Sequence, residues 1–223
     1  YGSHYAHATP LLIGLAIGMY GLGQAIFQIP MSLLADKLPR KPIIIAGLLV
    51  FALGGVICAL STDIYMVIFG RFIAGSGAVS AVVMALLADV TREQHRTKAM
   101  AAMGLTIAMS VMVAFGVGPL LTHILDISGL FWVTVVSALL AIGLLAIVPT
   151  PTRVLKHNLA EKSVKKQFAD VLRIGDINRL HIAVFALHLS MTAMFTLLPH
   201  QFTQVLGLNV AQQGYVYLPL LLL

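Results

Sequence analysis

Long apolar runs alternate with short polar connections along the whole chain. Spanning the hydrocarbon core of a bilayer takes about 20 apolar residues in a helix. Six runs approach or exceed that length, and a seventh begins near Gly214. The pattern predicts an all-α polytopic membrane protein with these spans: Leu11–Leu34, Ile43–Leu60, Ile64–Ala88, Ala99–Thr122, Leu130–Val148 and Leu180–Leu198.

One connection is long. Residues 150–179 carry Val164, Phe168, Val171 and Leu172 at helical spacing, which predicts an amphipathic helix on the inner membrane surface. A plain solvated linker is the alternative. We therefore expect three parts: a helical bundle without its first helix over residues 1–149, a cytoplasmic linker over 150–179, and the start of a second bundle over 180–223.

Composition supports this class of protein. Hydrophobic residues make up 59% and charged residues only 10%, with a mean hydropathy of +0.96. Soluble domains carry about 25% charged residues, so a soluble enzyme or binding domain is excluded. The single cysteine, Cys58, lies inside a span and is read as a small core residue.

The basic residues indicate an orientation. Thirteen of the 14 Lys and Arg residues lie in three connections, and the alternating connections contain none. This is the positive-inside pattern, which predicts that the basic connections face the cytoplasm. The net charge of +6 then reflects topology, and nucleic-acid binding is not expected.

The connection between the first two runs holds charges that oppose the helix dipoles. Asp36 ends one helix, whereas Arg40 and Lys41 begin the next. An anion is disfavoured at a helix C-terminus and a cation at an N-terminus, so these charges need partners elsewhere. We interpret this set as a conformational latch, with ordinary loop charges as the alternative: Asp36, Lys37, Arg40, Lys41, Asp89 and Arg92.

Arg71 is the sole charged residue within the six runs. Placing an arginine at a span centre costs roughly 2.5–3.5 kcal/mol on insertion scales. Such a residue usually faces a cavity or a partner. We expect Arg71 to face the interior, with snorkelling to the outer surface as the alternative.

Polar residues form stripes on two runs. Tyr20, Gln24 and Gln28 follow i, i+4, i+8 spacing on the first run, and His188 begins a similar stripe on the sixth. A polar stripe along a span indicates a water-accessible interior. Hydrogen bonding between helices is the alternative.

Small residues and prolines mark packing and bending. Gly14 and Gly18 form a G-x-x-x-G, and a small-residue stripe on the third run begins at Gly70 and Ala74; both allow close helix packing. Proline inside a helix removes a backbone hydrogen bond. We therefore expect bends at Pro30 and at the motif Gly116, Gly118 and Pro119, or a neutral kink at that motif.

The sequence motifs of several common classes of enzyme are absent. No Asp or Glu lies within a full run, and no hydrolase, zinc-protease, phosphate-loop or paired-cysteine motif is present. His4 and His7 are too isolated to suggest a metal site. We expect no enzyme activity, no cofactor and no metal.

Three segments together resemble the major facilitator superfamily. Ser32–Lys41 resembles its loop motif G-x-x-x-D-[RK]-x-G-R-[RK], and Gly70–Gly77 is similar to its R-x-x-Q-G-x-G motif. Gly118–Pro119 resembles the core of the fifth-helix motif of proton-coupled antiporters. The chain departs from these motifs where other residues replace the glycines and the glutamine: Ser32, Pro39, Ala74, Thr122 and His123.

The resemblance implies helices two to seven of twelve and the start of the eighth, in a two-bundle protein that works by alternating access. It implies that the charged connection latches the bundles and that Arg71 influences a coupling carboxylate. That carboxylate is expected in a helix preceding this chain. His188 is the titratable alternative within the runs.

The expected function is proton-coupled efflux of small amphipathic or drug-like molecules across a bacterial inner membrane. The partners implied are a small-molecule substrate, protons and membrane lipid, with no oligomer required. A metabolite or sugar exporter on the same scaffold and a sensor without transport are the alternatives.

Overall fold

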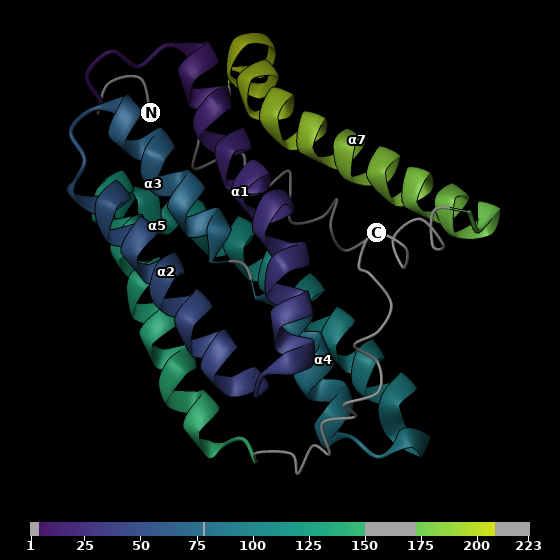
Figure 1. Ribbon diagram of the computed structural model, residues 1–223. Helices are drawn as coiled ribbons and strands as arrows, with labels where there is room; N and C mark the ends of the chain where they lie inside the picture. The colour runs from purple at the N-terminus through teal and green to yellow at the C-terminus, as the bar shows by residue number, and fades with distance from the viewer. Residues whose placement is uncertain (1–4, 78, 150–172, 208–223) are drawn as a thin grey trace. The chain divides into compact units, whose positions relative to one another are not determined.

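The computed structural model describes residues 5–77, 79–149 and 173–207, and nearly all of them are helical (Figure 1). The elements are α1 (Pro10–Lys37), α2 (Arg40–Leu60), α3 (Ile64–Ser76), α4 (Ser80–Val90), the short 3₁₀ helix η1 (Glu93–His95), α5 (Arg96–Ile147) and α7 (Gly175–Leu206). Five segments of the described residues are long and apolar enough to cross a membrane: Pro10–Lys37, Arg40–Leu60, Ile64–Val90, Glu93–Gly118 and Ile124–Ile147. The predicted all-α polytopic class is confirmed.

The chain forms two compact units, Tyr1–Arg153 and Val154–Leu223. The first contains α1 to α5 and the second contains α7. The sixth apolar run is helical within α7 but is not among the five spans, so its crossing of the membrane stays a prediction. The predicted amphipathic helix and the seventh run lie outside the described residues.

The third apolar run, predicted as the span Ile64–Ala88, lies within a segment long and apolar enough to cross a membrane, but its helix is interrupted. The helix ends at Ser76 and restarts at Ser80, with Gly77 as the C-cap and Val79 at φ −119° and ψ 9°. The break lies where the backbone meets α2, because a Cβ on Gly77 would come within 2.5 Å of the Phe51 nitrogen. Glycine favours such close contact and disfavours helix continuation.

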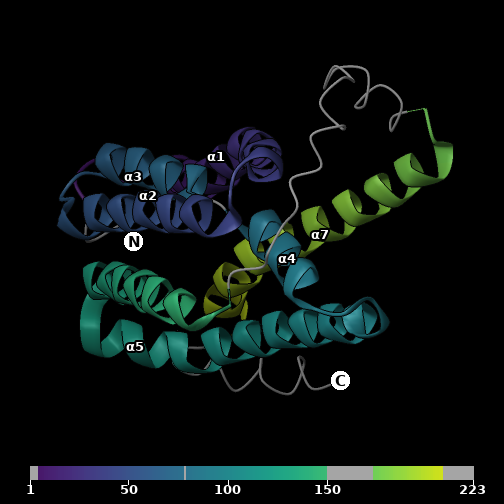
Figure 2. The same cartoon turned by 60° about the horizontal axis from the view of Figure 1, so that its bottom comes forward.

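α5 consists of two arms that reverse direction at Asp126, where φ is 56° and ψ is −177°. Figure 2 shows the arm before Asp126 (96–125, first arm) folding back on the arm after it (127–147, second arm). This reversal falls inside the predicted connection His123–Gly129. The second arm packs against α2, with Ala52, Val135 and Ala138 buried between them.

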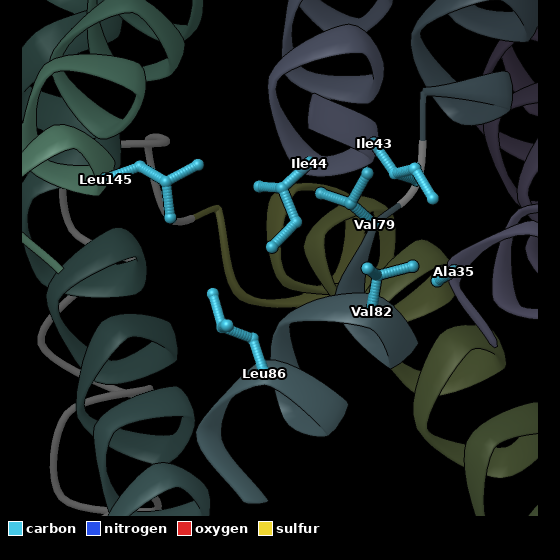
Figure 3. Close-up of a cluster of buried hydrophobic side chains, with 7 residues drawn as sticks. All are labelled: Ala35, Ile43, Ile44, Val79, Val82, Leu86 and Leu145. Atoms are coloured by element: carbon cyan, nitrogen blue, oxygen red, sulfur yellow. The ribbon is translucent and has the colours of Figure 1, made fainter. Parts of the chain in front are cut away.

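An apolar cluster packs the start of α2 against the end of α1, α4 and the second arm. Its buried residues come from α1, α2, α4, the second arm and the break before α4 (Figure 3): Ala35, Ile43, Ile44, Val79, Val82, Leu86 and Leu145. In Figure 3, Leu145 faces Ile44 and Leu86 across the space between their helices. Many large apolar residues elsewhere, such as Leu53 and Leu140, are exposed, as expected for helix surfaces that meet lipid.

Candidate functional site

Arg40 and Asp89 form an ion pair at one end of the first unit. Arg40 Nε lies 2.5 Å from Asp89 Oδ2, and the side chains are 9% and 23% exposed. Arg40 is the first residue of α2, and Asp89 lies in the last turn of α4. Each charge opposes its own helix dipole, so each supplies the partner that the other needs.

Two further cations bind helix C-termini at the same end. Lys41 Nζ donates to the carbonyl oxygen of Val148, the C-cap of α5. Arg96 Nε donates to the carbonyl oxygen of Ala88 over 3.2 Å. The last carbonyls of a helix lack intrahelical partners, and cations there interact favourably with the dipole. We call Arg40, Lys41, Asp89 and Arg96 the charged end.

The predicted latch residues have different surroundings. Arg40 and Asp89, two members of the predicted set, form an ion pair, whereas Lys41 contacts a backbone carbonyl that the sequence analysis did not anticipate. Asp36, Lys37 and Arg92 are exposed near the helix ends. Arg96, which the sequence analysis left out of the latch, belongs to the charged end because its Nε donates to a carbonyl oxygen in the last turn of α4.

Arg71 lies on α3 and faces α1. Its guanidinium carbon is 4.8 Å from the ring centroid of Tyr20, and its Nε donates to the carbonyl oxygen of Ala16 over 3.4 Å. The side chain also lines a pocket between α2, α3 and the second arm. The other lining residues are Phe51, Gly55, Cys58, Ala74, Phe131 and Thr134.

The two polar stripes have different surroundings. Tyr20, Gln24 and Gln28 are all half-buried on α1, and Tyr20 contacts Arg71. His188 is exposed on α7, in the other unit, and its Nδ1 lies 2.9 Å from the carbonyl oxygen of Val184 in its own helix.

The glycine–proline motif lies in the first arm of α5. The backbone angles at Gly116, Gly118 and Pro119 stay helical. A Cβ on Gly118 would meet nothing within 4 Å, so no close helix contact is formed there by the described residues. The Thr122 hydroxyl donates to the Gly118 carbonyl oxygen over 2.5 Å. The expected bends at Pro119 and Pro30 stay predictions.

The opposite end of the unit holds a contact that sequence reasoning missed. Ala6 and Asp63 form an isolated parallel β-bridge, with Ala6 N donating to Thr62 O over 3.0 Å. The Asp63 carboxylate caps α3 by accepting from Tyr65 N over 3.0 Å, and it lies 3.5 Å from His7 Nδ1. Asp63 directly before an apolar run was the available N-cap signal.

Comparison with known proteins identifies the family. The family model described as Major Facilitator Superfamily matches residues 3–223. The inner membrane transport protein YajR of Escherichia coli is 44% identical over 225 residues, which cover all of this chain and 49% of that protein. An uncharacterized transporter of Buchnera aphidicola from Acyrthosiphon pisum is 38% identical, again over all of this chain and 57% of its own length.

A third relative matches over a shorter stretch. The class H tetracycline resistance protein of Pasteurella multocida is 36% identical over 117 residues, covering 52% of this chain and 28% of that protein. The chain spans about half the length of the first two relatives. A family match over nearly all residues, together with the apolar helices, supports one conclusion: this multi-pass membrane chain belongs to the major facilitator superfamily.

Proposed function

We propose that the full-length protein is a secondary transporter of the bacterial inner membrane that exports small amphipathic or drug-like molecules by alternating access, driven by proton influx. Membership of the major facilitator superfamily supports transport. The likeness to a tetracycline resistance protein supports efflux of drug-like molecules over import. The partners are then a small-molecule substrate, protons and lipid, and the activity requires no oligomer.

The observation that carries the mechanism is the ion pair of Arg40 and Asp89. It joins the start of α2 to the end of α4 and is partly buried, so solvent and salt screen it less than a surface pair. Because a difference of about 1.4 kcal/mol changes an equilibrium tenfold, one such pair can bias a two-state conformational change. We assign Asp36, Lys37 and Arg92, exposed beside it, to contact with a second bundle.

Arg71 is assigned to proton coupling. It is partly buried on α3 and borders a pocket, and its charge favours the ionised form of any nearby carboxylate. Gln24 and Gln28 are assigned to the polar lining of the path, and His188 is the alternative titratable group. Gly116, Gly118 and Pro119 are assigned to a bend in the first arm.

The proposed orientation has the charged end in the cytoplasm, following the basic connections. It is tested in cells with Cys58→Ala protein carrying either Thr62→Cys or Lys98→Cys, both at exposed positions. A membrane-impermeant thiol reagent should label Thr62→Cys from outside, and Lys98→Cys only after permeabilisation. The reverse labelling pattern would contradict the orientation.

Transport is tested with full-length protein in proteoliposomes carrying an imposed pH gradient and a panel of amphipathic cations and drugs. Wild-type protein should move at least one compound against its gradient. Asp36→Asn, Asp89→Asn and Arg71→Ala should each slow transport, whereas Lys98→Gln, at an exposed position, should not.

Other outcomes separate the alternatives. If Asp36→Asn and Arg71→Ala export at the wild-type rate, the latch and coupling roles fail. Transport restricted to sugars or metabolites favours the exporter alternative. If no substrate moves, the sensor without transport is favoured.

A further inference from the structure

α1 and α3 approach each other closely enough for their backbones to touch. A Cβ on Gly75 would collide with the carbonyl oxygen of Tyr20, and a Cβ on Gly23 would lie 2.5 Å from the carbonyl oxygen of Phe72 and 3.0 Å from Ser76 N. Glycines on both helices therefore allow this contact. The main chain of Tyr20 is therefore held against α3 next to Gly75.

This contact determines where the Tyr20 ring lies. Arg71 precedes Gly75 by four residues, so both face α1 on neighbouring turns of α3. The guanidinium of Arg71 lies over the ring of Tyr20, with 4.8 Å between Cζ and the ring centroid. Ala16, one turn before Tyr20, is 6% exposed and accepts a hydrogen bond from Arg71 Nε over 3.4 Å. Arg71 is thus held from two successive turns of α1.

We propose that Tyr20 is a positioning residue for Arg71: its aromatic face holds the guanidinium against α1 and so sets the direction of the Arg71 charge during proton coupling. This inference rests on the proposed function for its consequence, but the contact itself is independent of transport. An aromatic ring attracts a cation through its quadrupole, most strongly where water is excluded. The hydroxyl group is not required for this attraction, so phenylalanine should replace Tyr20 and leucine should not.

The first test compares Tyr20→Phe and Tyr20→Leu in full-length protein in proteoliposomes, over a range of pH on the side that supplies protons. Tyr20→Leu should lower the rate of gradient-driven transport about 2- to 30-fold and displace its pH profile. Tyr20→Phe should keep the wild-type profile. Phe69→Leu is the control, because Phe69 is an exposed aromatic residue on α3, the helix that carries Arg71.

The second test does not need transport. Thermal unfolding in detergent is measured for Tyr20→Leu, Arg71→Gln and the double variant. If Tyr20 holds Arg71, the Tyr20→Leu loss in unfolding temperature should be smaller when Arg71 is already replaced. Additive losses would show that the two side chains are not coupled and would overturn the inference.

The two tests separate the inference from the proposed function. If wild-type protein does not respond to a pH gradient, the proposed proton coupling and the role of Tyr20 in it are overturned, and the coupled thermal shifts establish only the contact. If transport occurs and Tyr20→Leu keeps the wild-type pH profile, the positioning role is overturned. It is also overturned if Tyr20→Phe is as impaired as Tyr20→Leu, since the ring would then not be the active part.

Discussion

Arg40 Nε and Asp89 Oδ2 lie 2.5 Å apart, although 49 residues separate them in the chain. The pair joins two helices whose dipoles would each repel the charge they carry, the cation at the start of α2 and the anion at the end of α4. It therefore turns two locally unfavourable placements into one contact between helices. The exposed fractions of 9% and 23% make the removal of one partner costly.

The first prediction concerns this ion pair. Arg40→Gln or Asp89→Asn should lower the free energy of unfolding by about 1–3 kcal/mol, because each leaves a partly buried charge without its partner. The double variant should lose less than the sum of the two. Thermal unfolding of purified full-length protein in detergent measures this.

The matched control is the pair of Arg179 and Asp176 on α7, whose side chains are 85% and 92% exposed. Arg179→Gln should leave the unfolding temperature unchanged, since exposed pairs contribute little. If Arg179→Gln lowered the unfolding temperature as much as Arg40→Gln, burial would not explain the contribution of the Arg40–Asp89 pair to stability.

The second prediction concerns Lys41. Lys41→Met removes the cation that donates to the Val148 carbonyl at the end of α5, and it should cost about 0.3–1 kcal/mol of unfolding free energy. Lys98→Met is the comparison, because Lys98 is exposed in the first turn of the same helix, where a cation is unfavourable. It should be neutral or slightly stabilising. If both variants lose the same stability, the C-terminal contact of Lys41 is not the cause.

The third prediction concerns the packing of α1 on α3. Gly75→Ala should destabilise the protein by about 1–3 kcal/mol, because the added methyl group meets the Tyr20 backbone. Gly18→Ala adds the same group where nothing lies within 4 Å, and alanine is the better helix former by roughly 0.5–1 kcal/mol. Gly18→Ala should therefore be neutral or stabilising. Thermal unfolding in detergent should give a lower unfolding temperature for Gly75→Ala and an unchanged or higher one for Gly18→Ala.

The fourth prediction concerns the cap of α3. Asp63→Ala should cost about 1 kcal/mol, because the backbone nitrogen of Tyr65 loses its acceptor. Asp63→Asn keeps that acceptor and loses only the charge opposite His7, so most of the stability should remain. His7→Ala separates the two contributions: a loss equal to that of Asp63→Ala would show that the contact with His7, not the cap, is the stabilising one.

Sequence patterns were sufficient to predict most of the helices and some of the residues of the charged end. The apolar runs predicted α1, α2 and both arms of α5, because a backbone in lipid must satisfy its hydrogen bonds within each helix. They did not predict the break between Ser76 and Ser80, since the run stays apolar there and the break depends on contact with α2. The dipole argument showed that Arg40 and Lys41 needed partners but did not pair them with particular residues. It could not direct Lys41 to Val148 O, because the sequence does not show which backbone carbonyl a side chain will meet.

The amino-acid sequence is enough to predict the membrane class, most of the helical segments and the residues whose charges need partners. The partners themselves follow from the folded bundle: Asp89 for Arg40, and Tyr20 with the Ala16 carbonyl for Arg71. This is because some interactions act within one helix, whereas others act between helices that are distant in the sequence. Hydropathy and helix dipoles act within one segment and can be read along the chain, whereas the approach of α1 to α3 depends on two surfaces, with Gly23 on one and Gly75 on the other, that come together only in the folded bundle.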